Sequence, residues 1–220
     1  MDSLPLPERS TRVRKMRKRD KTGFWNIPNS ITVGRIAAVP VMVWLLWRGE
    51  GAEIPSRNMC IITMAIFALA MLTDILDGYL ARKWGLVSVI GAFLDPLADK
   101  LMVTATLIML VPLGWLPGWI VALLICRELT ITALRTIAVS EGLVLKASLW
   151  GKYKTASQAT ALGFLLWHHP TKLFWIIDID AHACGIALIY VALGFSLWSG
   201  WLYLSQFFAH VAKDTSPSAA

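Results

Sequence analysis

Four aspartates, Asp74, Asp77, Asp95 and Asp99, lie close together in a strongly apolar stretch of the sequence. The first two are three positions apart and the last two are four apart, so on helices each pair shares one face. Burial and mutual repulsion disfavour the ionised form of neighbouring carboxylates, and a bound cation removes that penalty. Oxygen ligands suit Mg²⁺, Mn²⁺ or Ca²⁺. We therefore predict that these residues hold two divalent ions, an arrangement used for phosphoryl displacement.

The residues beside the aspartates suit a phosphate-bearing ligand. Gly78 and Ala81 lie on or next to the acidic face of the first helix, and their small size lets a ligand approach the backbone. Arg82 offers a planar fork for phosphate oxygens. The short segment 84–90, with Gly85 as a helix stop, predicts that the two helices run antiparallel and that their acidic faces meet.

The composition identifies the elements that must position these groups. The 220 residues are 56% hydrophobic and 16% charged, whereas soluble domains are about 45–50% apolar with about a quarter of their residues charged. This excludes a disordered chain, a collagen and an ordinary soluble enzyme. The eleven Trp residues are typical of membrane interfaces. Because a spanning helix needs about 20 apolar residues, the chain holds at most about six spans.

We predict an all-α polytopic membrane protein with six transmembrane helices and a basic N-terminal juxtamembrane segment. Residues 1–25 form that segment, 26–210 the six-helix catalytic domain, and 211–220 a disordered tail. The expected spans are about 26–47, 58–80, 93–112, 117–139, 153–170 and 183–209.

Charge distribution predicts the orientation of the chain. Eight of the Lys and Arg residues fall between Arg9 and Lys21, directly before the first span. Basic residues favour the cytoplasmic side, so the N-terminus and the aspartates are expected there. The segment could also contact anionic lipid headgroups. A nucleic-acid-binding arm is the competing interpretation, and its position immediately ahead of a span argues against it.

The aspartate stretch resembles the signature of the CDP-alcohol phosphotransferase family at every fixed position. Those positions are Asp74, Asp77, Gly78, Ala81, Arg82, Gly91, Asp95 and Asp99. The resemblance implies an enzyme in which a hydroxyl displaces CMP from a CDP-linked lipid or alcohol with Mg²⁺ or Mn²⁺. It also implies a homodimer, as relatives suggest.

The same resemblance implies a role for each motif residue. Asp74, Asp77 and Asp95 are expected to be metal ligands, and Asp99 both a ligand and the general base. Four further positions are expected to line the CDP site beside Asp74; these are Gly78, Ala81, Arg82 and Gly91.

Three other stretches are similar to the bacterial phosphatidylglycerophosphate synthase branch of this family: residues 26–35, 126–135 and 147–158. The similarity implies CDP-diacylglycerol as donor, glycerol-3-phosphate as acceptor and a location in a bacterial cytoplasmic membrane among membrane lipids. Inositol phosphate, serine or a second lipid remain alternative acceptors. A small cation transporter and a non-catalytic scaffold are alternatives of other classes. A transporter predicts polar groups throughout the membrane depth, whereas the aspartates cluster at one end.

Cationic residues after the fourth span favour a phosphorylated acceptor. Arg127 and Arg135 are eight apart, roughly on one helix face, and with Lys152 they are predicted to bind the acceptor phosphate. Lys154 is equally well explained as a positive-inside charge. Glu128, beside Arg127, is interpreted as balancing a cation.

Asn29 and Arg35 begin the first span, together with Thr32. An arginine there needs a partner or ligand, so either both residues lie near the nucleotide or they form a buried pair or a headgroup contact.

The histidines and aspartates between 168 and 182 are interpreted as a solvated loop rather than a metal site.

Overall fold

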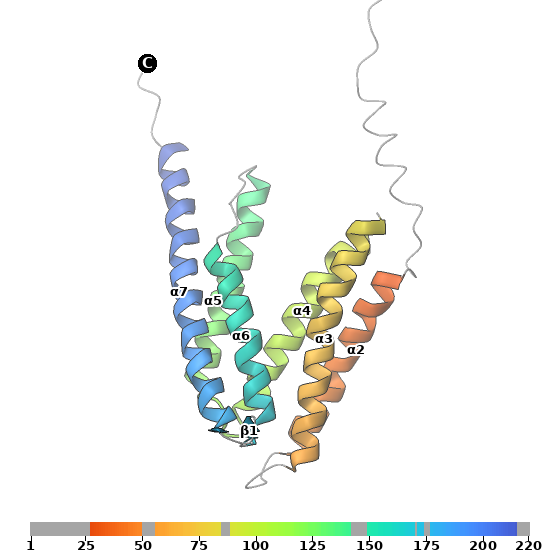
Figure 1. Ribbon diagram of the computed structural model, residues 1–220. Helices are drawn as coiled ribbons and strands as arrows, with labels where there is room; N and C mark the ends of the chain where they lie inside the picture. The colour runs from red at the N-terminus through yellow and green to blue at the C-terminus, as the bar shows by residue number, and fades with distance from the viewer. Residues whose placement is uncertain are drawn as a thin grey trace, which may run out of the picture. The chain divides into compact units, whose positions relative to one another are not determined.

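The computed structural model describes residues 27–49, 56–84, 89–141, 149–169, 171–173 and 177–214. Within these ranges the chain forms six helices, shown in Figure 1. They are α2 (Ile27–Trp47), α3 (Arg57–Trp84), α4 (Val89–Leu110), α5 (Gly118–Ser140), α6 (Leu149–Trp167) and α7 (Ala181–Asp214). The predicted helical architecture is confirmed, and each helix overlaps one predicted span.

Three of the helices are long and apolar enough to cross a membrane by length and composition: Asn29–Trp47, Arg57–Asp74 and Ala181–Ala209. The predicted basic segment 1–25 and the loop around Gly85 lie outside the described residues. Helix α7 continues to Asp214 and so includes 211–214, which the sequence analysis assigned to the tail.

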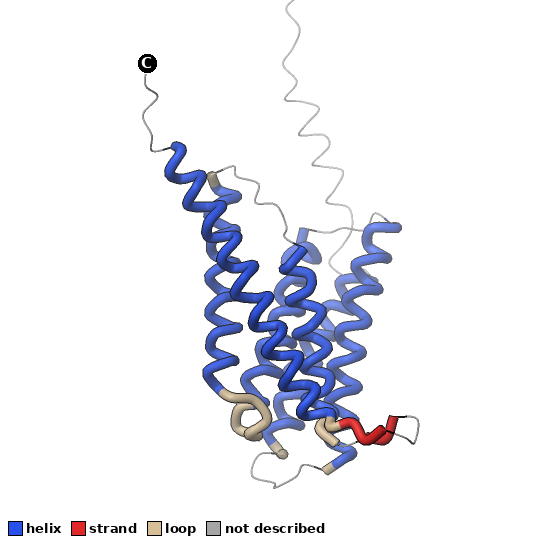
Figure 2. The backbone as a smooth tube through the Cα atoms, turned by 60° about the vertical axis from the view of Figure 1, so that its left-hand side comes forward, coloured by secondary structure: helices blue, strands red, loops and turns tan. Residues whose placement is uncertain are grey.

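A short β-hairpin separates α6 from α7, where the sequence analysis expected only a loop. Strands β1 (Thr171–Leu173) and β2 (Ile177–Ile179) pair antiparallel, with Thr171 opposite Ile179 (Figure 2). Threonine and isoleucine are β-branched and favour extended backbone, which accounts for the hairpin.

The described chain divides into two compact units. The aspartate unit comprises residues 27–41, 68–84 and 89–102, from α2, α3 and α4. The carboxyl-terminal unit comprises the described residues of 42–67 and from Val103 onward, including α5, α6 and α7.

The core of the carboxyl-terminal unit is built on α7, against which both α6 and α5 pack. Leu162, Leu165 and Leu166 of α6 and Ile189 of α7 are fully buried. At Gly185 the two helices approach so closely that a Cβ atom would lie 2.8 Å from the Leu165 Cγ and 3.0 Å from its backbone nitrogen. The glycine therefore sets the distance between α6 and α7.

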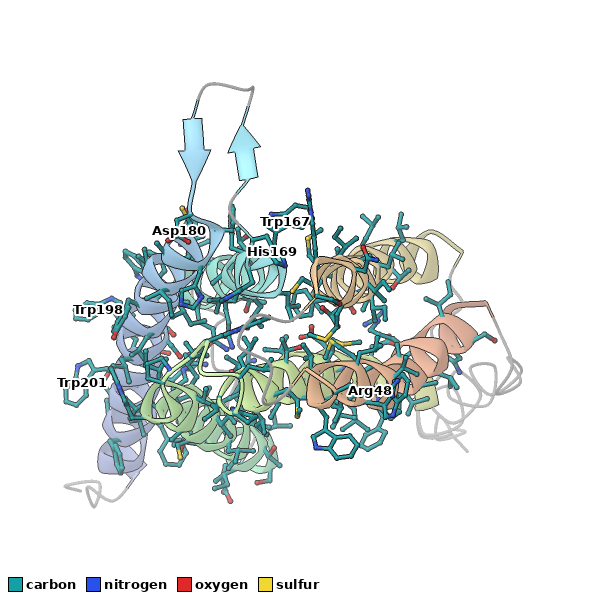
Figure 3. All side chains as sticks on the ribbon, turned by 90° about the horizontal axis from the view of Figure 1, so that it is seen from below. Arg48, Trp167, His169, Asp180, Trp198 and Trp201 are labelled. Carbon is teal, nitrogen blue, oxygen red and sulfur yellow. The ribbon has the colours of Figure 1, made fainter. Side chains whose placement is uncertain are left out.

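Large apolar side chains cover the outer surface of this unit. Trp198 is 54% and Trp201 66% exposed, and Figure 3 shows both pointing away from α7. The outward tryptophans fit contact with lipid and its interface.

Gly185→Ala is expected to lower the free energy of unfolding by about 1–3 kcal/mol, because overpacking forces the two helices apart. The matched control is Gly194→Ala on the same helix, where a Cβ meets nothing within 4 Å. It should be neutral or stabilising by about 0.5–1 kcal/mol through helix propensity. Thermal unfolding in detergent compares the variants, and equal shifts for both would contradict the close-approach argument.

Candidate functional site

Polar side chains of α2 reach the aspartates of both α3 and α4 within the aspartate unit. The Arg35 guanidinium of α2 forms an ion pair with Asp74 Oδ1 of α3. One helical turn earlier, Thr32 Oγ1 donates a hydrogen bond of 2.6 Å to Asp95 Oδ1 of α4. Helix α2 therefore orients two of the four aspartates, one on each neighbouring helix.

The spacing of the α2 residues explains this geometry. Asn29, Thr32 and Arg35 lie three positions apart, so they follow one helix face, and all three are buried. A buried guanidinium needs a carboxylate or a ligand, and Asp74 supplies the carboxylate. The structure thus gives Arg35 a protein partner, Asp74, whose side chain is 39% exposed, and the place of Arg35 and Asn29 near the nucleotide stays a prediction.

The sequence analysis did not assign Thr32 to the site. Its hydroxyl is fully buried and lies within hydrogen-bonding distance of a motif carboxylate 63 residues away in sequence. The signal that could have found it is its register: it lies on the face that also carries Arg35, and a buried hydroxyl requires a partner.

Helix α4 carries the second aspartate pair. Asp95 and Asp99 are one turn apart and partly buried, and Gly91 lies one turn before Asp95 and is buried. Pro96 is inside the helix, and because proline has no backbone N–H it leaves the carbonyl of residue 92 without its helical donor. The helix continues through this position, but it lacks one backbone hydrogen bond beside the motif carboxylates.

Only part of the predicted metal site lies among the described side chains. Asp77, Gly78, Ala81 and Arg82 belong to α3, but their side-chain surroundings lie outside the described residues. Among the side chains that are described, no three His, Cys, Asp or Glu residues are placed to hold a metal ion. The donor chemistry fits a hard divalent cation, because the motif supplies carboxylates. A carboxylate has about four acceptor positions, so one bond to Arg35 or Thr32 does not exhaust it.

In the carboxyl-terminal unit, a second charged group joins three helices. Arg127 of α5 donates from Nε to the Ser196 carbonyl of α7 at 2.9 Å and from Nη2 to Ser199 Oγ at 2.5 Å. Its Nη1 donates to Glu128 Oε2 at 3.3 Å. Lys154 Nζ of α6 donates to that same Glu128 oxygen at 2.6 Å. Glu128 therefore balances two cations, as its position in the sequence suggested.

The other two predicted phosphate ligands lie differently. Arg135 is exposed, and its guanidinium lies over the Tyr203 ring of α7, 5.4 Å from the ring centroid. Lys152 is exposed, whereas Lys154 is buried, because residues two apart on a helix point in different directions. Among the described contacts, the lysine that shares Glu128 with Arg127 is Lys154 and not Lys152.

The histidines near the hairpin pack as an aromatic cluster. The His168 ring stacks on Trp115 with centroids 3.9 Å apart, and its edge meets His182 at 4.8 Å. Burial lowers the pKa of His168 to about 4, and the neighbouring His182 and His169 add to this effect. In Figure 3, His169 lies at the end of α6 and Asp180 at the start of α7. His168 is thus a packed ring, not the solvated residue expected from the sequence.

His168 makes the stability depend on pH. Its pKa is about 4 in the folded state and about 6.5 in an unfolded chain, so between these values the unfolded state binds more protons. Stability should therefore fall as the pH falls from 6.5 towards 4. His168→Asn removes the titration and tolerates the positive φ of 51°. Melting temperatures from pH 4.5 to 7.5 should vary less in this variant, and an unchanged slope would contradict the assignment.

The CDP-alcohol phosphatidyltransferase family model matches residues 25–202. This range includes the aspartate motif, the α2 face that contacts it, and the Arg127, Glu128 and Lys154 group. The match therefore covers both units of the chain.

Individual relatives extend over most of the chain. The CDP-diacylglycerol–glycerol-3-phosphate 3-phosphatidyltransferase of Bacillus subtilis (strain 168) is 38% identical over 190 residues, covering 83% of this chain and 95% of the relative. The enzyme of the same name from Haemophilus influenzae is 38% identical over 185 residues, covering 82% and 92%. A CMP-forming cardiolipin synthase of Oryza sativa subsp. japonica is 39% identical over 201 residues, covering 85% and 59%. The chain belongs to the CDP-alcohol phosphatidyltransferase family.

Proposed function

We propose that this integral membrane protein is a phosphatidyltransferase of phospholipid biosynthesis. It transfers the phosphatidyl group of CDP-diacylglycerol to glycerol-3-phosphate, forming phosphatidylglycerophosphate and releasing CMP. The observation that carries the proposal is the pair of contacts from α2, Arg35 to Asp74 and Thr32 to Asp95, which orient motif carboxylates on two helices. The names of relatives that match almost end to end support the same donor and acceptor.

The reaction is a displacement at phosphorus. The sn-1 hydroxyl of glycerol-3-phosphate attacks the β-phosphorus of CDP-diacylglycerol, and the bond from that phosphorus to the CMP oxygen breaks. Asp99 accepts the hydroxyl proton, and CMP leaves with the bond's electron pair. A general base of this kind contributes about 10²–10⁴-fold to a rate.

The motif carboxylates have a second role as ligands. Asp74, Asp77, Asp95 and Asp99 would hold two divalent ions, Mg²⁺ or Mn²⁺, and ions bound there supply positive charge to the pyrophosphate. The bond from Thr32 fixes the orientation of Asp95, and the ion pair with Arg35 fixes that of Asp74. Such bonds from neighbouring side chains hold metal-binding carboxylates in one orientation before an ion binds.

The remaining motif residues are proposed to bind the donor. Gly78, Ala81, Arg82 and Gly91 would line the CDP site, with Asn29 and Arg35 contributing from α2. Asn29 and Arg35 are each 3% exposed, so their polar groups must be satisfied by protein or by ligand. The ion pair with Asp74 keeps the Arg35 cation close to the carboxylates that the donor phosphates approach.

For the acceptor, we propose that Arg127, Arg135 and Lys152 bind its phosphate, with Lys154 added because it shares Glu128 with Arg127. A second acceptor, another phospholipid, is favoured by one observation: the cardiolipin synthase of Oryza sativa is as similar to this chain as the glycerol-3-phosphate enzymes are.

We further propose that the protein has six spans in a bacterial cytoplasmic membrane and forms a homodimer. Its N-terminus and its site face the cytoplasm.

Asp99→Asn is expected to abolish CMP release, because the amide has nearly the same shape but cannot accept the hydroxyl proton. The assay uses purified protein, CDP-diacylglycerol, Mg²⁺ or Mn²⁺ and one acceptor at a time: glycerol-3-phosphate, inositol phosphate, serine or phosphatidylglycerol. The control is Asp180→Asn, which keeps the oxygen that accepts from the Ala183 backbone N–H. Near-wild-type turnover by Asp99→Asn would exclude the base assignment, and release only with phosphatidylglycerol would favour the second acceptor.

Thr32→Val is expected to raise the metal concentration needed for half-maximal activity by about 10–100-fold, because Asp95 loses its orienting hydrogen bond. Thr32→Ser should restore most of the affinity. The control is Thr63→Val, since the buried Thr63 hydroxyl donates to carbonyls of its own helix. Direct Mn²⁺ binding, measured without substrate, gives a second readout. An unchanged Mn²⁺ affinity in Thr32→Val would show that the bond does not serve metal binding.

A further inference from the structure

Arg127, Glu128 and Lys154 form a group of three charged side chains, called here the α5 charge cluster. It joins α5, α6 and α7 inside the carboxyl-terminal unit. Two cations and one carboxylate leave it with an excess of positive charge, which is complementary to an anion. Its carboxylate has no part in the aspartate motif, so it needs a separate explanation.

Burial in the cluster is uneven. The side chains of Lys154 and Arg127 are 10% and 12% exposed, whereas that of Glu128 is 31% exposed. A nearly buried ammonium requires a partner, because removing water from a charge costs several kcal/mol. The carboxylate is thus the most accessible member of the cluster, and the two cations are nearly buried.

The two cations depend on Glu128 to different extents. Arg127 is held on α7 by its bonds to Ser196 and Ser199. The bond from Arg127 to Glu128 is longer, at 3.3 Å, than that from Lys154, at 2.6 Å. Loss of the carboxylate would therefore leave Arg127 anchored and release Lys154.

We propose that Glu128 is a positioning residue for acceptor binding: its carboxylate holds the Lys154 ammonium beside the Arg127 guanidinium, and together these cations receive the phosphate of a phosphorylated acceptor. This inference rests on the proposed function for the identity of the acceptor. The lysine ammonium has three N–H donors, and Glu128 takes one, so the same side chain can be held and still donate to an anion. Glu128 itself touches no substrate in this scheme.

The kinetic test uses Glu128→Gln, which removes the charge and nearly keeps the shape. The KM for glycerol-3-phosphate should rise about tenfold or more, with the KM for CDP-diacylglycerol unchanged, because only the acceptor meets the cluster. Glu128→Asp, which retains the charge, should restore much of the affinity. Glu141→Gln is the matched control, since Glu141 is exposed at the end of α5. Equal increases in both KM values would overturn the proposal.

A double variant separates positioning from structural pairing. Replacing a buried ion pair with uncharged residues is often neutral for stability, so Glu128→Gln with Lys154→Met should fold as well as the wild type. If the pair only stabilises the fold, the double variant should recover the acceptor KM. We expect it to stay defective in acceptor KM while its melting temperature recovers. Recovery of both quantities would overturn the proposal.

Ligand-induced stabilisation tests the cluster independently of turnover. Glycerol-3-phosphate should raise the melting temperature of the wild-type protein and of Glu141→Gln, and should raise that of Glu128→Gln much less. Stabilisation without CMP release would refute the proposed function while supporting the role of Glu128. Normal CMP release with an equal shift in Glu128→Gln would refute the role of Glu128 alone. No shift in the wild type would show that the cluster is not a phosphate site.

Discussion

The constraint on which the structure depends is the pairing of charges inside an apolar chain. A charged side chain within a membrane is costly unless it meets an opposite charge or a polar partner. Arg35 meets Asp74, and Lys154 meets Glu128. Each pair joins two different helices, so satisfying the charge also fixes how those helices are rotated about their axes. The requirement for pairing thus determines which residues face one another.

The same pairing prepares the side chains for chemistry. Between membrane helices there is little hydrophobic driving force, and hydrogen bonds between them contribute about 0.6–2 kcal/mol each. The bond from Thr32 to Asp95 is modest by this measure, but it selects one orientation of a carboxylate. Arg127 is held in the same manner by Ser196 and Ser199. Small contributions to stability therefore give precise placement of functional groups.

Sequence reasoning recovered the helices because hydropathy and breakers such as Pro117 mark where an apolar segment ends. It also identified the motif carboxylates, since spacings of three and four residues define a helix face without reference to other helices. It could not choose between Lys152 and Lys154, because that choice depends on how α6 is rotated relative to α5. The partner of Thr32 and the hairpin at 171–179 were missed because they depend on pairing between distant or very short segments.

The carboxylates of the two units have opposite consequences for a phosphate-bearing ligand. In the aspartate unit, carboxylates dominate the motif, and carboxylate and phosphate oxygens repel each other, so the proposed divalent ions would lie between them and a bound pyrophosphate. In the α5 charge cluster a single carboxylate is outnumbered by two cations that already share its oxygen. We propose that the acceptor phosphate binds there directly, without an added ion. Under this proposal the two arrangements distinguish the diphosphate donor from the phosphorylated acceptor, whereas a single basic site would bind both substrates alike.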